Sequence, residues 1–79
     1  MDAATVKALL ENHLPDCEFY VQGEGSNYDI VAVGDVFQDL RPVKKQQLVY
    51  GALSEEIAGG AIHAVNIRTL TPAEWQEQA

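Results

Sequence analysis

A lone cysteine is the feature that most constrains how this chain can fold. Cys17 is the only thiol among 79 residues, so neither an internal disulfide nor a metal site built from several thiolates of one chain can supply stability. A chain of this length buries only about 60% of the surface that its unfolded form exposes. The sequence therefore predicts one small domain, residues 1–79, that depends on its apolar core. We expect no deep active-site cleft and no enzyme activity.

The charge of the chain is strongly acidic. Twelve Asp and Glu residues against five Lys and Arg give a net charge of -7, which repels polyanions on average and favours solubility. The stretch Met1 to Leu14 contains Asp2 and Glu11 and does not resemble a secretory signal. No segment approaches the roughly 20 apolar residues of a membrane span. We therefore expect a cytoplasmic protein, in a reducing compartment, with no membrane partner.

Apolar spacing predicts the helices. Apolar residues recur at three- and four-residue intervals in an opening segment that ends at Pro15, and again in a long segment from Pro42 to Gly59-Gly60. Proline fits the first turn of a helix, and glycine is typical of its end. Thr71 and Glu74 form the pattern of a capping box, which predicts a short last helix holding the only tryptophan.

Three runs of strand-forming residues predict the sheet. Residues 18–21 and 28–33 flank the glycine-containing turn 23–27, so they should form an antiparallel hairpin. Residues 61–70 alternate and carry β-branched side chains, which favours a third strand. The near-continuous apolar run in 28–33 favours a central strand. The predicted fold class is α+β, with element order α-β-β-α-β-α and helices on one face of a three-stranded sheet.

Two side chains could take part in metal chemistry, and each has a structural alternative. Cys17 precedes the first strand, where a lone thiol behaves either as a small buried apolar group or as a soft metal ligand or redox-sensitive thiol. His63 falls inside the predicted third strand, among small and apolar neighbours. It is either a hydrogen-bonded edge histidine or a neutral imidazole offered to a metal centre.

Three of the five basic residues gather at the start of the long helix. Arg41, Lys44 and Lys45 share one helical face, where cations oppose the helix dipole. They are either a solvated face balanced by Asp35 and Asp39, or a surface that meets an anionic partner. Such a partner could be a protein, a glutathione carboxylate or nucleic acid.

Three segments together resemble the BolA family, most nearly its bacterial IbaG-type branch. They are Arg41 to Tyr50, the run Ile62-His63-Ala64-Val65, and the ending Leu70-Thr71-Pro72-Ala73-Glu74-Trp75. The resemblance covers essentially the whole chain and implies a fold similar to class II KH domains. It also implies partnership with a CGFS-type monothiol glutaredoxin, sharing a bridging [2Fe-2S] cluster held in part by glutathione, in iron-sulfur trafficking or regulation.

The resemblance also implies which residues hold the cluster. The cluster-binding histidine of the family corresponds to His63, and a second ligand in many members comes from the loop between the first two strands. That place is taken here by Asn27, and Cys17 is the only thiol. A [2Fe-2S] cluster needs four ligands, and histidine can replace cysteine on one iron. This chain alone cannot supply four, so we expect the partner to complete the site.

The alternative function is a nucleic-acid-binding transcriptional regulator with a KH-like fold. KH domains grip nucleic acid with a GXXG loop, and no two glycines here are three positions apart. Binding would then depend on Arg41, Lys44 and Lys45. We place this function second.

Overall fold

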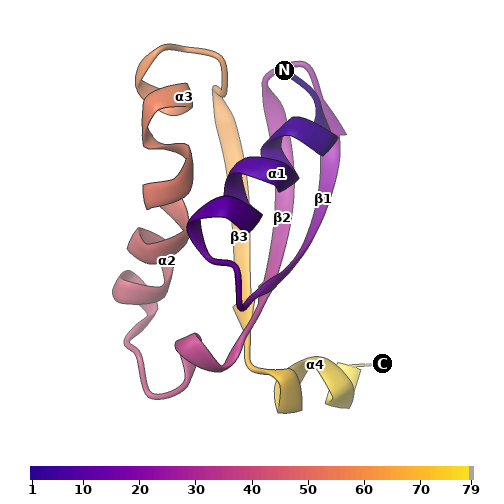
Figure 1. Cartoon of the computed structure of the whole chain (residues 1–79), viewed down its shortest axis with the longest axis vertical. Helices are drawn as coiled ribbons and strands as arrows, with labels where there is room; N and C mark the ends of the chain where they lie inside the picture. Colours follow the sequence, from indigo (N-terminus) through magenta and orange to yellow (C-terminus); the bar gives the residue numbers. More distant parts are fainter. Residues whose placement is uncertain (79) are drawn as a thin grey trace.

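The structure is a computed structural model that describes residues 1–78 (Figure 1). The helices and strands follow one another in an order close to the predicted one. The elements are α1 (Ala3–His13), β1 (Glu18–Glu24), β2 (Asn27–Val33), α2 (Pro42–Tyr50), α3 (Ser54–Ala58), β3 (Ala64–Leu70) and α4 (Pro72–Gln78).

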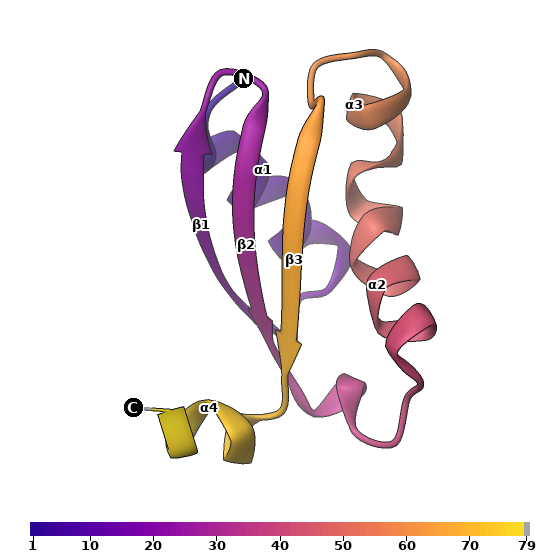
Figure 2. The same ribbon diagram turned by 180° about the vertical axis from the view of Figure 1, so that it is seen from behind.

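The three strands form one sheet in the order β1-β2-β3, so the prediction that residues 28–33 are central is confirmed (Figure 2). β1 and β2 form the predicted antiparallel hairpin, in which Glu24 is paired with Asn27. β2 and β3 run parallel, and Asn27 is paired with Ala64. Parallel neighbours need a long crossover connection, which here contains α2 and α3.

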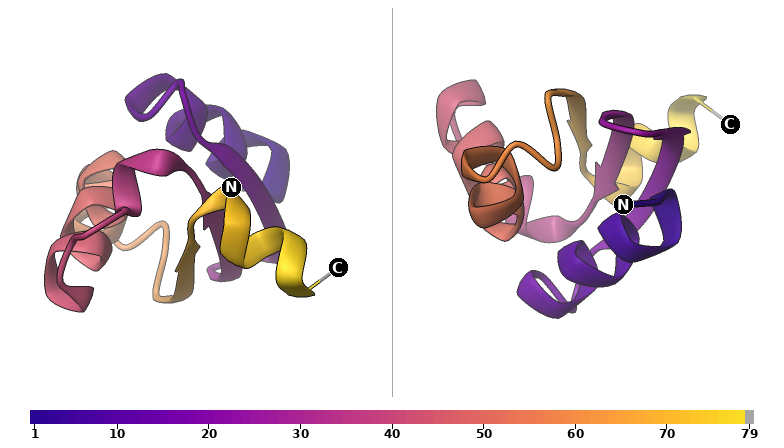
Figure 3. Two further views of the ribbon diagram at one scale, coloured as in Figure 1. Left: turned by 90° about the horizontal axis from the view of Figure 1, so that it is seen from below. Right: turned by 90° about the horizontal axis from the view of Figure 1, so that it is seen from above.

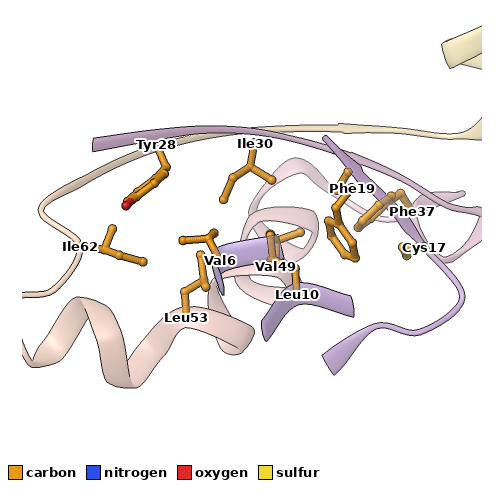
Figure 4. Close-up of a cluster of buried hydrophobic side chains, with 11 residues drawn as sticks. Val6, Leu10, Cys17, Phe19, Tyr28, Ile30, Phe37, Val49, Leu53 and Ile62 are labelled. Atoms are coloured by element: carbon orange, nitrogen blue, oxygen red, sulfur yellow. The ribbon is translucent and has the colours of Figure 1, made fainter. Parts of the chain in front are cut away.

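One face of the sheet carries the core (Figure 4). Alternate residues of a strand point to opposite faces, and the inward set of β1 and β2 meets apolar residues of α1 and α2. α2 also contacts β3 directly, because the Gln46 Nε2 group donates to the Ile67 carbonyl at 2.9 Å. The side chains that are at most 2% exposed are Val6, Leu10, Phe19, Tyr28, Ile30, Ala32, Phe37, Val49, Leu53 and Ile62.

The last helix departs from the prediction that all helices lie on one face. The ring of Trp75 in α4 stacks on that of Tyr20, with centroids 4.9 Å apart. Tyr20 follows the buried Phe19 in β1, so it points away from the core. α4 thus closes the end of the opposite face, at the carboxyl end of β3 (Figure 3). The predicted capping box is present, since the Thr71 amide donates to the Glu74 carboxylate at 2.8 Å.

The predicted long helix is interrupted. Residues Gly51–Leu53 form a 3-10 turn between α2 and α3. A methyl group on Gly51 would lie 3.1 Å from the Nε2 atom of His13, so α1 approaches the backbone closely at this point. The predicted strand 61–70 is also shorter, because β3 begins at Ala64. His63 therefore lies in the loop before the strand, and its placement inside the strand was wrong.

Substitution of Gly23 should weaken the hairpin strongly. Gly23 has φ +132°, and a methyl group there would overlap the Asn27 carbonyl oxygen and lie 2.9 Å from the Tyr28 Cα. We expect Gly23→Ala to lower the free energy of unfolding by about 3 kcal/mol in urea titrations. Gly25→Ala is the matched control, because Gly25 has φ +66° and an added methyl group would meet no atom within 4 Å. Its cost should be about 1 kcal/mol, and equal losses would contradict the prediction.

Acid should loosen α4 through Glu74. Hydrogen bonds from the amide and then the hydroxyl of Thr71, with the charge of Lys45, hold the pKa of this carboxyl below its ordinary 4.5. Because the pKa is lower in the folded chain than in the unfolded chain, the ionised carboxylate stabilises the helix fully at pH values above 4.5. This stabilisation is lost as the pH falls through the pKa of the folded chain. Trp75 fluorescence should therefore change in that acid range in the parent but less in Glu74→Gln, which keeps the capping pattern without the titration. Identical titrations would contradict this.

Candidate functional site

His63 is exposed, and its backbone is fixed. The preceding residue, Ile62, is 2% exposed and inserts into the core beside Tyr28 (Figure 4). The amide of Ile62 donates to the Glu56 carbonyl at 3.2 Å, which ties the loop back to α3. Ala64 then begins β3. An exposed imidazole thus lies between two anchored neighbours. Because His63 precedes β3, it is not the histidine within an edge strand that the structural alternative described.

The loop that carries His63 rests on the turn between β1 and β2. The amides of His63 and Ala64 both donate to the Ser26 carbonyl, at 2.8 and 3.2 Å. Gly60, with φ +83°, redirects the chain after α3, and a methyl group there would lie 4.0 Å from the Nε2 atom of His63. The imidazole therefore lies near the glycine at the end of α3.

Asn27 belongs to the same corner of the molecule. It is exposed, and it is paired with Ala64, the residue after His63. The backbone register therefore places Asn27 and His63 at the same end of the sheet, and the role of Asn27 as a ligand stays a prediction. An amide oxygen is a hard ligand, less suited to an iron-sulfur centre than thiolate or imidazole.

Cys17 lies at the other end of the sheet. It precedes Glu18, which is paired with Val33, whereas Asn27 begins the seven-residue β2. Six steps along a strand separate the two ends by about 20 Å. Cys17 is 9% exposed and belongs to the core cluster, and burial, followed by the Asp16 charge, raises the pKa of its thiol. The structure agrees with a small buried apolar group and does not bring Cys17 to His63.

The three basic residues do not form one uniform surface. Arg41 is the N-cap of α2, and Arg41 and Lys44 are exposed. Lys45 is half-buried, and its charge acts on Glu74 of α4. Two of these three basic residues are therefore exposed to solvent, while Lys45 is half-buried.

Among the candidate metal ligands, the structure leaves His63 as the exposed imidazole next to the β1–β2 turn. The part of the chain that the structure describes contains no group of three or more His, Cys, Asp or Glu residues placed to hold one metal ion. An exposed, anchored imidazole suits a metal whose remaining ligands come from another molecule. His63 fits one ligand position of a [2Fe-2S] cluster and no more.

Two contributors to this geometry are absent from the sequence predictions. Tyr28 was assigned only to a strand, yet its hydroxyl lies 2.8 Å from the Gly25 carbonyl in the turn that supports His63. Ser26 contributes through its backbone carbonyl, for which side-chain identity gives no signal. The parallel register between β2 and β3 brings the loop of His63 to the Ser26 carbonyl, whereas the contact of Tyr28 with Gly25 is local to the turn.

Comparison with known proteins establishes the family. A family model described as "BolA-like protein" matches residues 5–74 of this chain. The chain belongs to the BolA family.

Its relatives share both sequence and fold. It is 47% identical over 75 residues to the acid stress protein IbaG of Escherichia coli, covering 95% of this chain and 89% of the relative. A solved structure of a BolA homologue from Coxiella burnetii has a TM-score of 0.85 at 25% identity and covers 96% of this chain and 97% of that one. The solution structure of yeast Fra2 has a TM-score of 0.76 at 27% identity, covering 98% and 86%.

These findings confirm the predicted family and the α+β fold. The similarity to class II KH domains stays a prediction. Among residues 1–78, no helix is long and apolar enough to cross a membrane.

The anchor beside His63 should matter for stability, and the imidazole should not. Ile62→Ala removes a side chain that is 2% exposed and should lower the free energy of unfolding by about 2–5 kcal/mol. His63→Ala should change it by less than about 0.5 kcal/mol, because the ring is exposed. Urea titrations of both variants check this. A loss at His63 comparable to that at Ile62 would contradict the prediction.

Proposed function

We propose that this chain partners a CGFS-type monothiol glutaredoxin and contributes His63 to a [2Fe-2S] cluster that the two proteins share. The observation that carries the proposal is the exposed imidazole on an anchored loop. Thiolates of the glutaredoxin and its glutathione would bind one iron, and His63 would approach the other. When bound, the cluster supplies iron-sulfur units for transfer or sensing.

Membership of the BolA family supports this partnership, since the resemblance stated above implies it. A partner role also agrees with the ligand count. The described residues provide no complete metal site, so binding at His63 requires donors from a second molecule. We accordingly propose a regulatory or partner protein rather than an enzyme.

The proposal implies sensitivity to acid. Imidazole binds a metal only in its unprotonated form, so protons compete with iron for His63. The shared cluster should therefore be released as the medium becomes acidic. The name of the Escherichia coli relative, an acid stress protein, is compatible with such a response in this chain.

The test is anaerobic reconstitution of the cluster on this chain with a CGFS-type glutaredoxin and glutathione. Visible absorbance and circular dichroism should change in His63→Ala relative to the parent, because one iron loses its imidazole. His13→Ala is the matched control. It removes the only other histidine, also exposed but located at the end of α1, and should give the parent spectrum.

Two outcomes would overturn the proposal. Parent-like spectra for His63→Ala would remove His63 from the ligand set. A mixture whose spectrum equals that of the glutaredoxin alone would remove the shared cluster altogether. Reconstitution with ¹⁵N-histidine in this chain adds a direct readout, since pulsed electron paramagnetic resonance of the reduced cluster should detect the coordinated nitrogen.

A further inference from the structure

The hydroxyl of Tyr28 lies at the end of the core nearest His63. Tyr28 is 2% exposed, and Figure 4 shows its oxygen at the same end of the core as Ile62. The hydroxyl lies 2.8 Å from the Gly25 carbonyl and 2.8 Å from the Met1 carbonyl. A hydroxyl has one proton and donates to one carbonyl at a time. Because Gly25 belongs to the turn between β1 and β2, donation to its carbonyl connects the buried phenol to that turn.

The same turn supports the loop that carries His63. The carbonyl next to that of Gly25 is that of Ser26, which accepts the amides of both His63 and Ala64. Two consecutive carbonyl groups therefore connect the Tyr28 phenol with the backbone of His63. The remaining anchor, Ile62, acts through apolar packing in the core.

We propose that Tyr28 is a positioning residue for His63, acting through the carbonyl groups of Gly25 and Ser26. The inference rests on the proposed function, because it assigns Tyr28 a role in presenting the metal ligand. Without its hydroxyl, the Gly25 carbonyl loses its buried donor and the turn gains freedom. The Ser26 carbonyl is then no longer held at one place, and the two amides that bind it open more often.

The first test needs neither cluster nor partner. Tyr28→Phe keeps the ring in the core, and hydrogen exchange measured by NMR should become about tenfold faster at the amides of His63 and Ala64. Tyr20→Phe is the matched control: it removes a phenol from the same hairpin, one that donates to the Glu18 carboxylate on the opposite face. It should leave both amides at parent rates.

The pattern of exchange separates positioning from ordinary stabilisation. A local role accelerates exchange in the turn and at His63 and Ala64, while amides within the central strand keep their rates. Uniform acceleration of all amides, or parent rates at His63 and Ala64, would overturn the proposal. The unmodified chain gives an independent measurement, because a scalar coupling between the His63 amide nitrogen and the Ser26 carbonyl carbon should be detectable. Its absence would also overturn the proposal.

Reconstitution with the glutaredoxin separates this inference from the proposed function. Tyr28→Phe should release the cluster about tenfold faster than the parent, and Tyr20→Phe should not. If His63→Ala gives the parent spectrum, the proposed function fails, whatever the exchange data show. If His63→Ala alters the spectrum but Tyr28→Phe matches the parent in cluster release, the positioning role of Tyr28 alone fails.

Discussion

The parallel pairing of β2 with β3 is the constraint on which the rest of the structure depends. It pairs Asn27 with Ala64, and so it brings the amino end of β3 to the turn between β1 and β2. That proximity lets the Ser26 carbonyl accept two amides from the loop that carries His63. It also requires the crossover through α2 and α3, whose inner side chains close the core. The site is therefore a consequence of strand register rather than of a local motif.

Local sequence patterns predicted the elements whose stability is itself local. The helix ended by Pro15, the hairpin and the capping box of Thr71 with Glu74 all appear in the structure. The patterns were insufficient where distant segments decide the conformation. The 3-10 turn at Gly51 coincides with the close approach of His13 from α1, and α4 lies on the opposite face because Trp75 stacks on a strand residue. Neither relation is visible within one stretch of sequence.

In the candidate site, too, local patterns predicted some features, and distant segments determine the others. His63 could be proposed as a ligand from the sequence because its residue type and its place near a strand match the pattern of the family. The exposure of His63 could not be predicted, because the alternation of residues 61–70 indicated a strand that includes it. In the structure the chain turns at Gly60, Ile62 is buried in the core, and the strand begins only at Ala64. Cys17 was weighed for the same chemistry by residue type alone, and the fold separates it from His63 by the length of the sheet.

The hydrogen bond from Gln46 to the Ile67 carbonyl has a consequence for the solution behaviour of the chain. β3 is an edge strand, and the free backbone groups of an edge can recruit a strand from another molecule and start aggregation. The side-chain amide of Gln46 donates a hydrogen bond to the carbonyl of Ile67 in this strand at 2.9 Å, and α2 lies against the strand. The crossover helix thus also covers part of this edge, so the strand that follows the exposed imidazole is less available for unwanted pairing.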